Sequence, residues 1–193
     1  SSDGDLLLKE YQAMGGMKYI IATEAESVLS SEEETREGEL QQLHAAFIPW
    51  LADINQDNDS PMRRVAAFSK LPPESHPLVQ ALIEKRLLLS DLRDGEQVVE
   101  VAHESLFRQW KVLADWLDAH REDLKETNRL EQDARAWREN GKKDEWLRVG
   151  ERLTIGERLA KEKIFAKKLE GVTEFLQVSR QREETRKQAE EDN

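Results

Sequence analysis

Residues 87–102, LLLSDLRDGEQVVEVA, contain two β-prone runs on either side of Arg93-Asp94-Gly95-Glu96. An Asp-Gly pair supplies the positive φ angles that a tight turn between antiparallel strands requires. This stretch therefore predicts a β-hairpin, and no other part of the sequence carries a strand signal of similar strength. Residues 62–71 are compatible with extended chain but have no clear period.

Helical patterns precede the hairpin. Ser31 followed by Glu34 has the capping-box spacing of a helix start. The apolar residues after it predict an amphipathic helix with a kink at Pro49; they are Leu40, Leu43, Phe47, Ile48 and Leu51. Leu78, Leu82 and Ile83 predict a short helix that ends near Arg86. Helices followed by one hairpin predict a winged-helix domain over residues 31–119.

The N-terminal part predicts a small helical domain over residues 1–30. Gly15-Gly16 separates two helical stripes there, which fits a tight turn between helices. The first stripe comprises Leu6, Leu7, Tyr11 and Met14, and the second Met17, Ile20, Ile21, Ala25 and Val28. The chain starts at Ser1-Ser2-Asp3, which does not resemble a native beginning, so we expect the natural protein to start upstream.

The C-terminal part is also predicted to be helical. Leu106, Trp110, Leu113 and Leu117 are spaced by four, three and four residues, so one face of a helix beginning after His103 is apolar. Further helical patterns predict a helical domain over residues 120–179. Residues 180–193 are almost devoid of apolar side chains and indicate a charged linker or frayed helix. The predicted fold class is therefore mainly α.

The overall charge argues against two classes of partner. The formal net charge of −11 disfavours nucleic acid and anionic membranes, because their phosphates would repel the chain. No apolar run approaches the roughly 20 residues of a membrane-spanning helix. There is no cysteine, which excludes thiolate zinc sites and disulfides. We therefore expect a cytoplasmic location.

No motif for catalysis is present in the sequence. Neither a phosphate-binding Gly-x-x-x-x-Gly-Lys-Ser/Thr loop nor a Gly-x-Gly-x-x-Gly pattern occurs. The four histidines, His44, His76, His103 and His120, are not spaced as metal ligands. The 40 acidic residues include no pair that stands out for acid–base chemistry. We therefore predict no catalytic residue, no metal ligand and no enzymatic activity for this chain alone.

His103 is the candidate binding residue. It lies where the second strand of the hairpin leads into the next helix. A helix start offers free backbone N–H groups and partial positive charge, which suit a phosphate, and a histidine there can donate a further hydrogen bond. The alternative is an exposed histidine near a helix cap. Arg63-Arg64 could also meet a phosphate, although a solvated arginine pair is the simpler interpretation.

The tryptophans leave a choice between core and interface. Trp110, Trp116, Trp137 and Trp146 all fall in predicted helices. Trp110 shares the apolar face of its helix, so we interpret it as a core residue. Trp116 lies off that face and is the better candidate for an interface anchor.

Residues 99–106, VEVAHESL, with Arg108, Trp110, Leu113 and Trp116-Leu117, resemble the winged-helix end of bacterial STAND-class NTPases. These proteins are relatives of the NACHT and apoptotic or plant-resistance ATPases, and many carry C-terminal WD repeats. The later segments are similar to the helical region that follows, namely Ala136-Trp137, Trp146-Leu147-Arg148, Arg152-Leu153 and Glu174-Phe175-Leu176 with Ser179. Tyr11, Gly15-Gly16 and Ala25-Glu26 resemble the helical domain after the NTPase core.

The resemblance implies a regulatory function. In this class the winged helix folds over ADP bound to the NTPase core and keeps the protein closed, and a histidine contacts the β-phosphate. The family pattern is often Met-His-Asp; here Ala102-His103-Glu104 keeps only the histidine unchanged. Gly15-Gly16 would fall near the family's Gly-x-Pro turn, but no proline follows, which favours a plain interhelical turn.

The same resemblance places the Walker motifs before Ser1. This chain would then neither hydrolyse nor tightly bind nucleotide, and the parent protein would bind ADP or ATP with magnesium. Its partners would be its own upstream NTPase core and downstream repeat domain, with oligomer formation a property of the whole protein.

Two other functions fit the sequence. A helical adaptor would use exposed tryptophans to bind a partner. A winged-helix nucleic-acid binder would need a basic recognition helix. Residues 73–86 contain Glu74 and Glu84 against Lys85 and Arg86, and residues 36–108 carry 8 basic and 12 acidic residues, which disfavours this second alternative.

Overall fold

A computed structural model describes residues 20–193, so the predictions for Leu6 to Met17, including Gly15-Gly16, lie outside the described residues. The described chain is mainly helical, with one two-stranded and one three-stranded sheet. It divides into two compact units, the first comprising residues 20–55 and 59–119, and the second 56–58 and 120–193. Over residues 20–193, no helix is both long and apolar enough to cross a bilayer.

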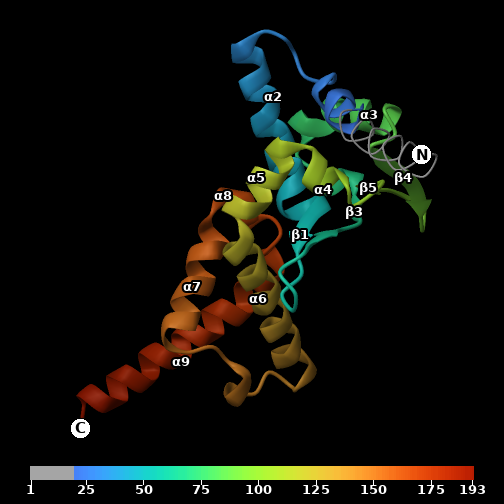
Figure 1. The fold of residues 1–193 in the computed structure, drawn as a ribbon. Coiled ribbons are helices and arrows are strands. Elements are labelled where there is room, and N and C mark those ends of the chain that lie inside the picture. Colours follow the sequence, from blue (N-terminus) through green and yellow to red (C-terminus); the bar gives the residue numbers. More distant parts are fainter. Residues whose placement is uncertain (1–19) are drawn as a thin grey trace, which may run out of the picture. The chain divides into compact units, whose positions relative to one another are not determined.

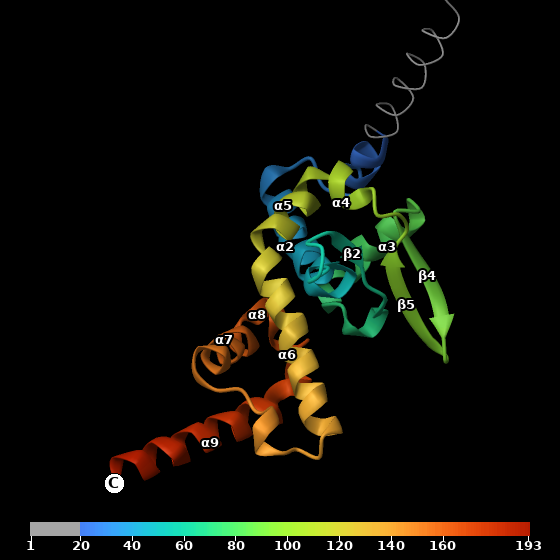
Figure 2. The same ribbon diagram turned by 60° about the horizontal axis from the view of Figure 1, so that its bottom comes forward.

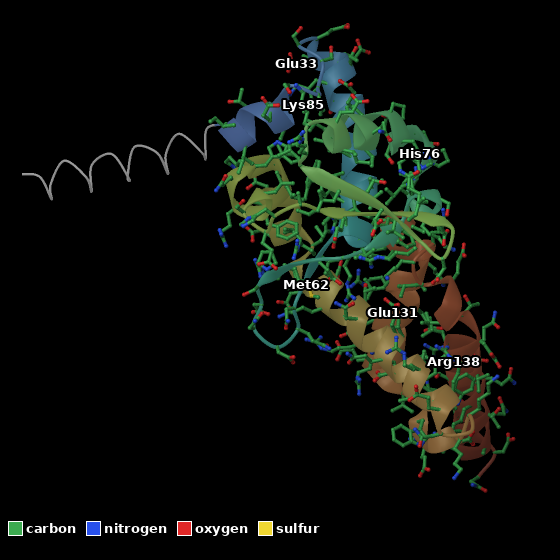
Figure 3. All side chains as sticks on the ribbon, turned by 90° about the vertical axis from the view of Figure 1, so that its right-hand side faces the viewer. Glu33, Met62, His76, Lys85, Glu131 and Arg138 are labelled. Atoms are coloured by element: carbon green, nitrogen blue, oxygen red, sulfur yellow. The ribbon has the colours of Figure 1, made fainter. Side chains whose placement is uncertain are left out.

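The helices of the first unit lie before, between and after its strands. Residues 20–26 are helical, and the elements that follow are α2 (Glu33–Ala46), η1 (Phe47–Leu51), η2 (Phe68–Lys70), η3 (Pro73–Ser75), α3 (His76–Glu84), α4 (Leu106–Gln109) and α5 (Lys111–Ala119) (Figure 1). The predicted capping box is wrong, because the N-cap of α2 is Glu32 and it makes no side-chain cap bond. Lys85, labelled in Figure 3, forms an ion pair with Glu24 at 3.4 Å.

The predicted helix through Leu51 ends earlier than its apolar pattern. The α-helix stops at Ala46, and Ile48 has non-helical angles, with φ of −105° and ψ of 118°. Pro49 accounts for the break, because proline lacks the N–H that continues a helix and disfavours helical angles in the residue before it. The Ile48–Pro49 bond is cis. Phe47, Ile48 and Leu51 are nevertheless fully buried. A short strand begins directly after Leu51, at Ala52.

The predicted hairpin is confirmed. Strand β4 (Leu88–Arg93) pairs antiparallel with β5 (Glu96–Val101), and Arg93 lies opposite Glu96. Asp94 and Gly95 have φ angles of 52° and 77°, which a two-residue turn of this hand requires. The core face carries Leu88, Val99 and Val101, all buried. Figure 2 shows the hairpin extending beyond α3, to which β4 connects directly.

Three short strands were not predicted as separate elements. Strand β1 (Ala52–Ile54) pairs with β2 (Pro61–Arg63), and β3 (Ala66–Ala67) joins the hairpin to give the order β3-β5-β4. Each has two or three residues, which is too short for a period-two pattern to appear.

The helix predicted after His103 is broken in two. Trp110 has extended angles, with φ of −95° and ψ of 100°, and separates α4 from α5. All four residues of the predicted stripe, Leu106, Trp110, Leu113 and Leu117, are nevertheless buried. The Trp110 ring packs edge-on against Phe47 at 5.9 Å, and its Nε1 donates to Glu26 at 3.0 Å. The core interpretation of Trp110 is confirmed.

The second unit is built from helices alone within the described residues. Its elements are α6 (Arg121–Glu139), η4 (Asp144–Trp146), α7 (Gly150–Lys161), α8 (Lys163–Ala166), η5 (Glu170–Val172) and α9 (Thr173–Glu191) (Figure 2). A Cβ at Gly156 would lie 3.1 Å from Leu176 Cδ2 and 3.3 Å from Leu130 Cδ1, so α7 packs closely on α6 and α9. Helix α9 continues through residues 180–191, which are almost entirely exposed.

Gly95 can be tested against Gly38, since nothing lies near either position where a Cβ would be added. Gly95→Ala forces an alanine into the left-handed region and should lower the free energy of unfolding by about 1–2 kcal/mol. Gly38→Ala lies inside α2 and should instead raise it by about 0.5–1 kcal/mol. Urea denaturation followed by circular dichroism measures both. Equal effects of the two substitutions would contradict the assigned turn.

Candidate functional site

His103 lies between the end of β5 and the start of α4, with its side chain exposed. Its Nδ1 accepts a hydrogen bond from the backbone N–H of Ser105 at 2.9 Å and lies 2.8 Å from the Ser105 Oγ. A backbone N–H can only donate, so Nδ1 must be the unprotonated nitrogen of the neutral ring. The proton is therefore on Nε2, which gives this exposed side chain a hydrogen-bond donor.

The predicted helix-start anion site is wrong in its physical basis. Helix α4 has only four residues and so offers little of a helix dipole. The backbone N–H groups of its first turn are also occupied: Leu106 donates to His103 O, Phe107 to Glu104 O and Arg108 to Ser105 O, each at 3.1 Å. What the segment offers an anion is the His103 side chain itself.

Arg63 is exposed, as the sequence suggested, whereas Arg64 is half-buried in an ion pair. Arg64 Nε binds Asp53 Oδ2 at 2.7 Å, and Asp53 is almost fully buried. Arg63 points elsewhere: its Nη1 lies 3.4 Å from the carbonyl oxygens of both Val101 and Ala102. Figure 3 labels its neighbour Met62 on β2. The first unit therefore places Arg63 against Ala102, the residue immediately before His103, although Arg63 and Ala102 are 39 residues apart in sequence.

The tryptophans divide between core and surface. Trp116 is half-buried, and its ring lies 5.1 Å from His44 and 6.0 Å from Trp110, within an aromatic cluster of the first unit. Trp137 is buried and packs on Phe175 at 5.6 Å. Trp146 is 42% exposed.

Arg148 is the buried charge at the centre of the second unit. Its side chain is 2% exposed; Nε binds Asp133 at 2.7 Å and Nη1 binds Glu126 at 2.8 Å. Its backbone N–H donates to Ser179 Oγ at 3.2 Å, so this residue joins α6 and α9 at the start of α7. Nη2 is buried without a hydrogen-bond partner among residues 20–193. Only the family resemblance had drawn attention to Arg148, because its carboxylate partners are distant in sequence.

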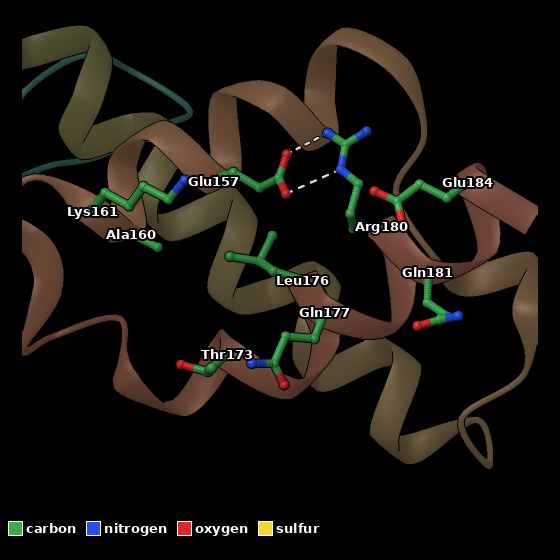
Figure 4. Close-up of a pocket in the computed structure, with 9 residues that line it drawn as sticks. All are labelled: Glu157, Ala160, Lys161, Thr173, Leu176, Gln177, Arg180, Gln181 and Glu184. Carbon is green, nitrogen blue, oxygen red and sulfur yellow. Dashed lines mark hydrogen bonds and ion pairs between the residues drawn. The ribbon is translucent and has the colours of Figure 1, made fainter.

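A groove of about 580 Å³ lies between α7 and α9 (Figure 4). Arg180 binds both oxygens of Glu157 there, with Nε at 3.1 Å from Oε2. The hydrogen bond from Arg180 holds the pKa of the Glu157 carboxyl below its ordinary value. A carboxylate so stabilised is a poor proton acceptor at neutral pH. Within the described chain, no group of three or more His, Asp or Glu side chains could hold a metal ion.

Arg148→Ala should strongly destabilise the protein. It leaves Glu126 and Asp133 without their buried cation and should cost about 3–5 kcal/mol of unfolding free energy. Arg152→Ala is the matched control, since Arg152 binds the same Asp133 at 2.9 Å but is 65% exposed. We expect it to cost less than about 1 kcal/mol in urea denaturation. Similar losses for both would argue against Arg148 as the central ion pair.

His120 should make stability depend on pH. Burial lowers the pKa of its imidazole below the ordinary 6.5, against the opposing effect of Asp123 and Glu162. The unfolded chain then binds the proton more readily than the folded chain. The contribution of neutral His120 to the free energy of unfolding is therefore fully present above pH 6.5 and is lost as the pH falls through the folded pKa. His120→Gln should flatten the decline of Tm below pH 6.5. An unchanged decline would refute this role.

No curated protein and no solved structure matches the chain. The family described as Novel STAND NTPase 1 matches residues 1–145, which include all of the described first unit and α6 of the second. This range contains the hairpin, Arg63 and His103. The chain therefore belongs to the Novel STAND NTPase 1 family.

Proposed function

We propose that this chain is the regulatory segment between the NTPase core and the repeat domain of a STAND-type signalling ATPase. It is not catalytic by itself. It inhibits the parent protein and relays the state of the nucleotide bound by the core. The observation that carries this proposal is the His103 side chain, whose Nδ1 is held by the Ser105 N–H and whose Nε2–H is left exposed as a donor.

The arrangement of the first unit supports a winged helix over residues 31–119. Helix α2, strand β3, helix α3 and the β4–β5 hairpin follow one another, and the sheet order is β3-β5-β4. The hairpin would be the wing. Helix α3 precedes it, in the position of a recognition helix, yet contains no lysine or arginine. A nucleic-acid function is therefore disfavoured, because phosphate contacts need cations on that helix.

His103 would act on the β-phosphate of ADP bound by the upstream core. Its Nε2–H donates to an anionic oxygen, which makes a stronger hydrogen bond than one between neutral groups. The Ser105 N–H keeps the ring in the tautomer that can donate. Bound ADP or ATP, with magnesium, supplies the phosphate charge that distinguishes the two states. The core, the downstream repeats and a relation to the NACHT ATPases belong to this proposal, as does a cytoplasmic location.

A second candidate is a helical adaptor that binds another protein through the second unit. Trp146 and Val149 are 42% and 49% exposed and lie close together in sequence before α7. Exposed aromatic and aliphatic side chains of this kind can anchor an interface. An adaptor would bind its partner without any dependence on nucleotide.

ADP affinity distinguishes these candidates. The measurement is calorimetry on the longer protein that includes the upstream core, with wild type compared with His103→Ala. Loss of a hydrogen bond to a charged group should weaken ADP binding by about 1–3 kcal/mol. His103→Gln retains an N–H donor and should keep more of the affinity. Equal ADP binding by wild type and His103→Ala would make His103 a structural residue and refute the proposed relay, and no ADP binding at all would favour the adaptor.

A further inference from the structure

Arg63 is held in place by the β1–β2 hairpin. Met62 lies opposite Asp53, and Arg63 lies opposite Ala52. Since side chains alternate along a strand, Arg63 projects to the face opposite its two neighbours. Its neighbour Arg64 is fixed by the ion pair with buried Asp53. Two interactions thus orient Arg63: the pairing of β1 with β2, and the ion pair between Arg64 and Asp53.

The guanidinium of Arg63 is tied to the backbone that leads into His103. Its Nη1 makes two hydrogen bonds of 3.4 Å, to the carbonyls of Val101 and Ala102. These bonds are long, and they use only one of the three nitrogens of the group. A guanidinium has five N–H donors in a planar fork that matches the oxygens of a phosphate.

Arg63 differs from the adjacent Arg64 in charge pairing. Several cations of the first unit bind carboxylates: Arg36 binds Glu26, Arg64 binds Asp53, Lys85 binds Glu24 and Lys111 binds Asp115. No carboxylate pairs with Arg63 among residues 20–193. In a chain of net charge −11, an arginine with open donors thus contacts the backbone of Ala102, one residue before His103.

We propose that Arg63 and His103 together bind the terminal phosphate of a nucleoside diphosphate. His103 donates one hydrogen bond from Nε2, and Arg63 supplies a positive charge and further N–H donors to the same phosphate. This inference rests on the proposed function, because the nucleotide is held by the upstream core. It adds Arg63, on the unpredicted strand β2, as a second phosphate ligand. The terminal phosphate is then the group that this segment recognises.

The test uses the longer protein with its core and measures the affinities for ADP and AMP by calorimetry. Arg63→Gln should weaken ADP binding roughly tenfold to hundredfold, while AMP, which lacks the terminal phosphate, should bind as to wild type. Arg93→Gln is the matched control, since Arg93 is an exposed arginine of the same unit on the hairpin. It should leave both affinities unchanged. Circular dichroism and urea denaturation check that each variant folds.

A double-mutant cycle separates direct contact from positioning. If Arg63 binds phosphate itself, Arg63→Gln should weaken ADP binding further in the His103→Ala background. If it only positions the backbone before His103, the second substitution should have no added effect, and the proposal is overturned. Arg63→Lys should recover part of the affinity by restoring the charge.

The remaining outcomes distinguish this inference from the proposed function. Normal ADP binding by Arg63→Gln together with loss in His103→Ala overturns the role of Arg63 and leaves the proposed function standing. Equal weakening of ADP and AMP by Arg63→Gln also overturns it, because recognition would not depend on the terminal phosphate. Wild type that fails to bind ADP, or His103→Ala that binds it normally, refutes the proposed function itself.

Discussion

The register of β4 against β5 is the constraint on which the first unit depends. The two-residue turn at Asp94-Gly95 sets Leu88 opposite Val101 and Ser90 opposite Val99. A slip of one residue would turn Leu88, the buried residue of β4, outward, because side chains alternate along a strand. On its other edge, β5 pairs with β3 through Val98 and Val99. The end of β5 also brings Ala102, one residue before His103, to Arg63 of β2.

Local signals in the sequence predicted local structure well. Asp94-Gly95 gave the hairpin because its turn geometry depends on two adjacent residues. The spacing of Leu106, Trp110, Leu113 and Leu117 predicted a buried face correctly but not the break at Trp110, since all four side chains remain buried on both sides of it. Pro49 predicted a kink within a helix, whereas in the structure the α-helix ends at Ala46, before Pro49.

The candidate site was predictable only in part. His103 was identified from its place after the hairpin and from the family resemblance. The hydrogen bond from the Ser105 N–H to its Nδ1 depends on the orientation of the ring, which the spacing of residues in the sequence does not determine. Arg63 is 39 residues from Ala102, and only strand pairing brings the two together. Arg148 depends likewise on carboxylates 15 and 22 residues away on α6. Contacts between distant segments are decided by the packing of the whole unit.

The two units satisfy their buried donors unequally. In the first unit the indole N–H of Trp110 meets the Glu26 carboxylate. In the second, Trp137 Nε1 and Arg148 Nη2 have no hydrogen-bond partner among the described residues. Each buried donor left unpaired costs about 1–3 kcal/mol. Both unpaired donors lie on buried side chains of the helical unit, so its native packing leaves part of its hydrogen-bonding capacity unused. In the described part of the first unit the unpaired buried atom is an acceptor, Gln109 Oε1, so a polar group that entered either core would find a partner already in place: an acceptor in the first unit, donors in the second.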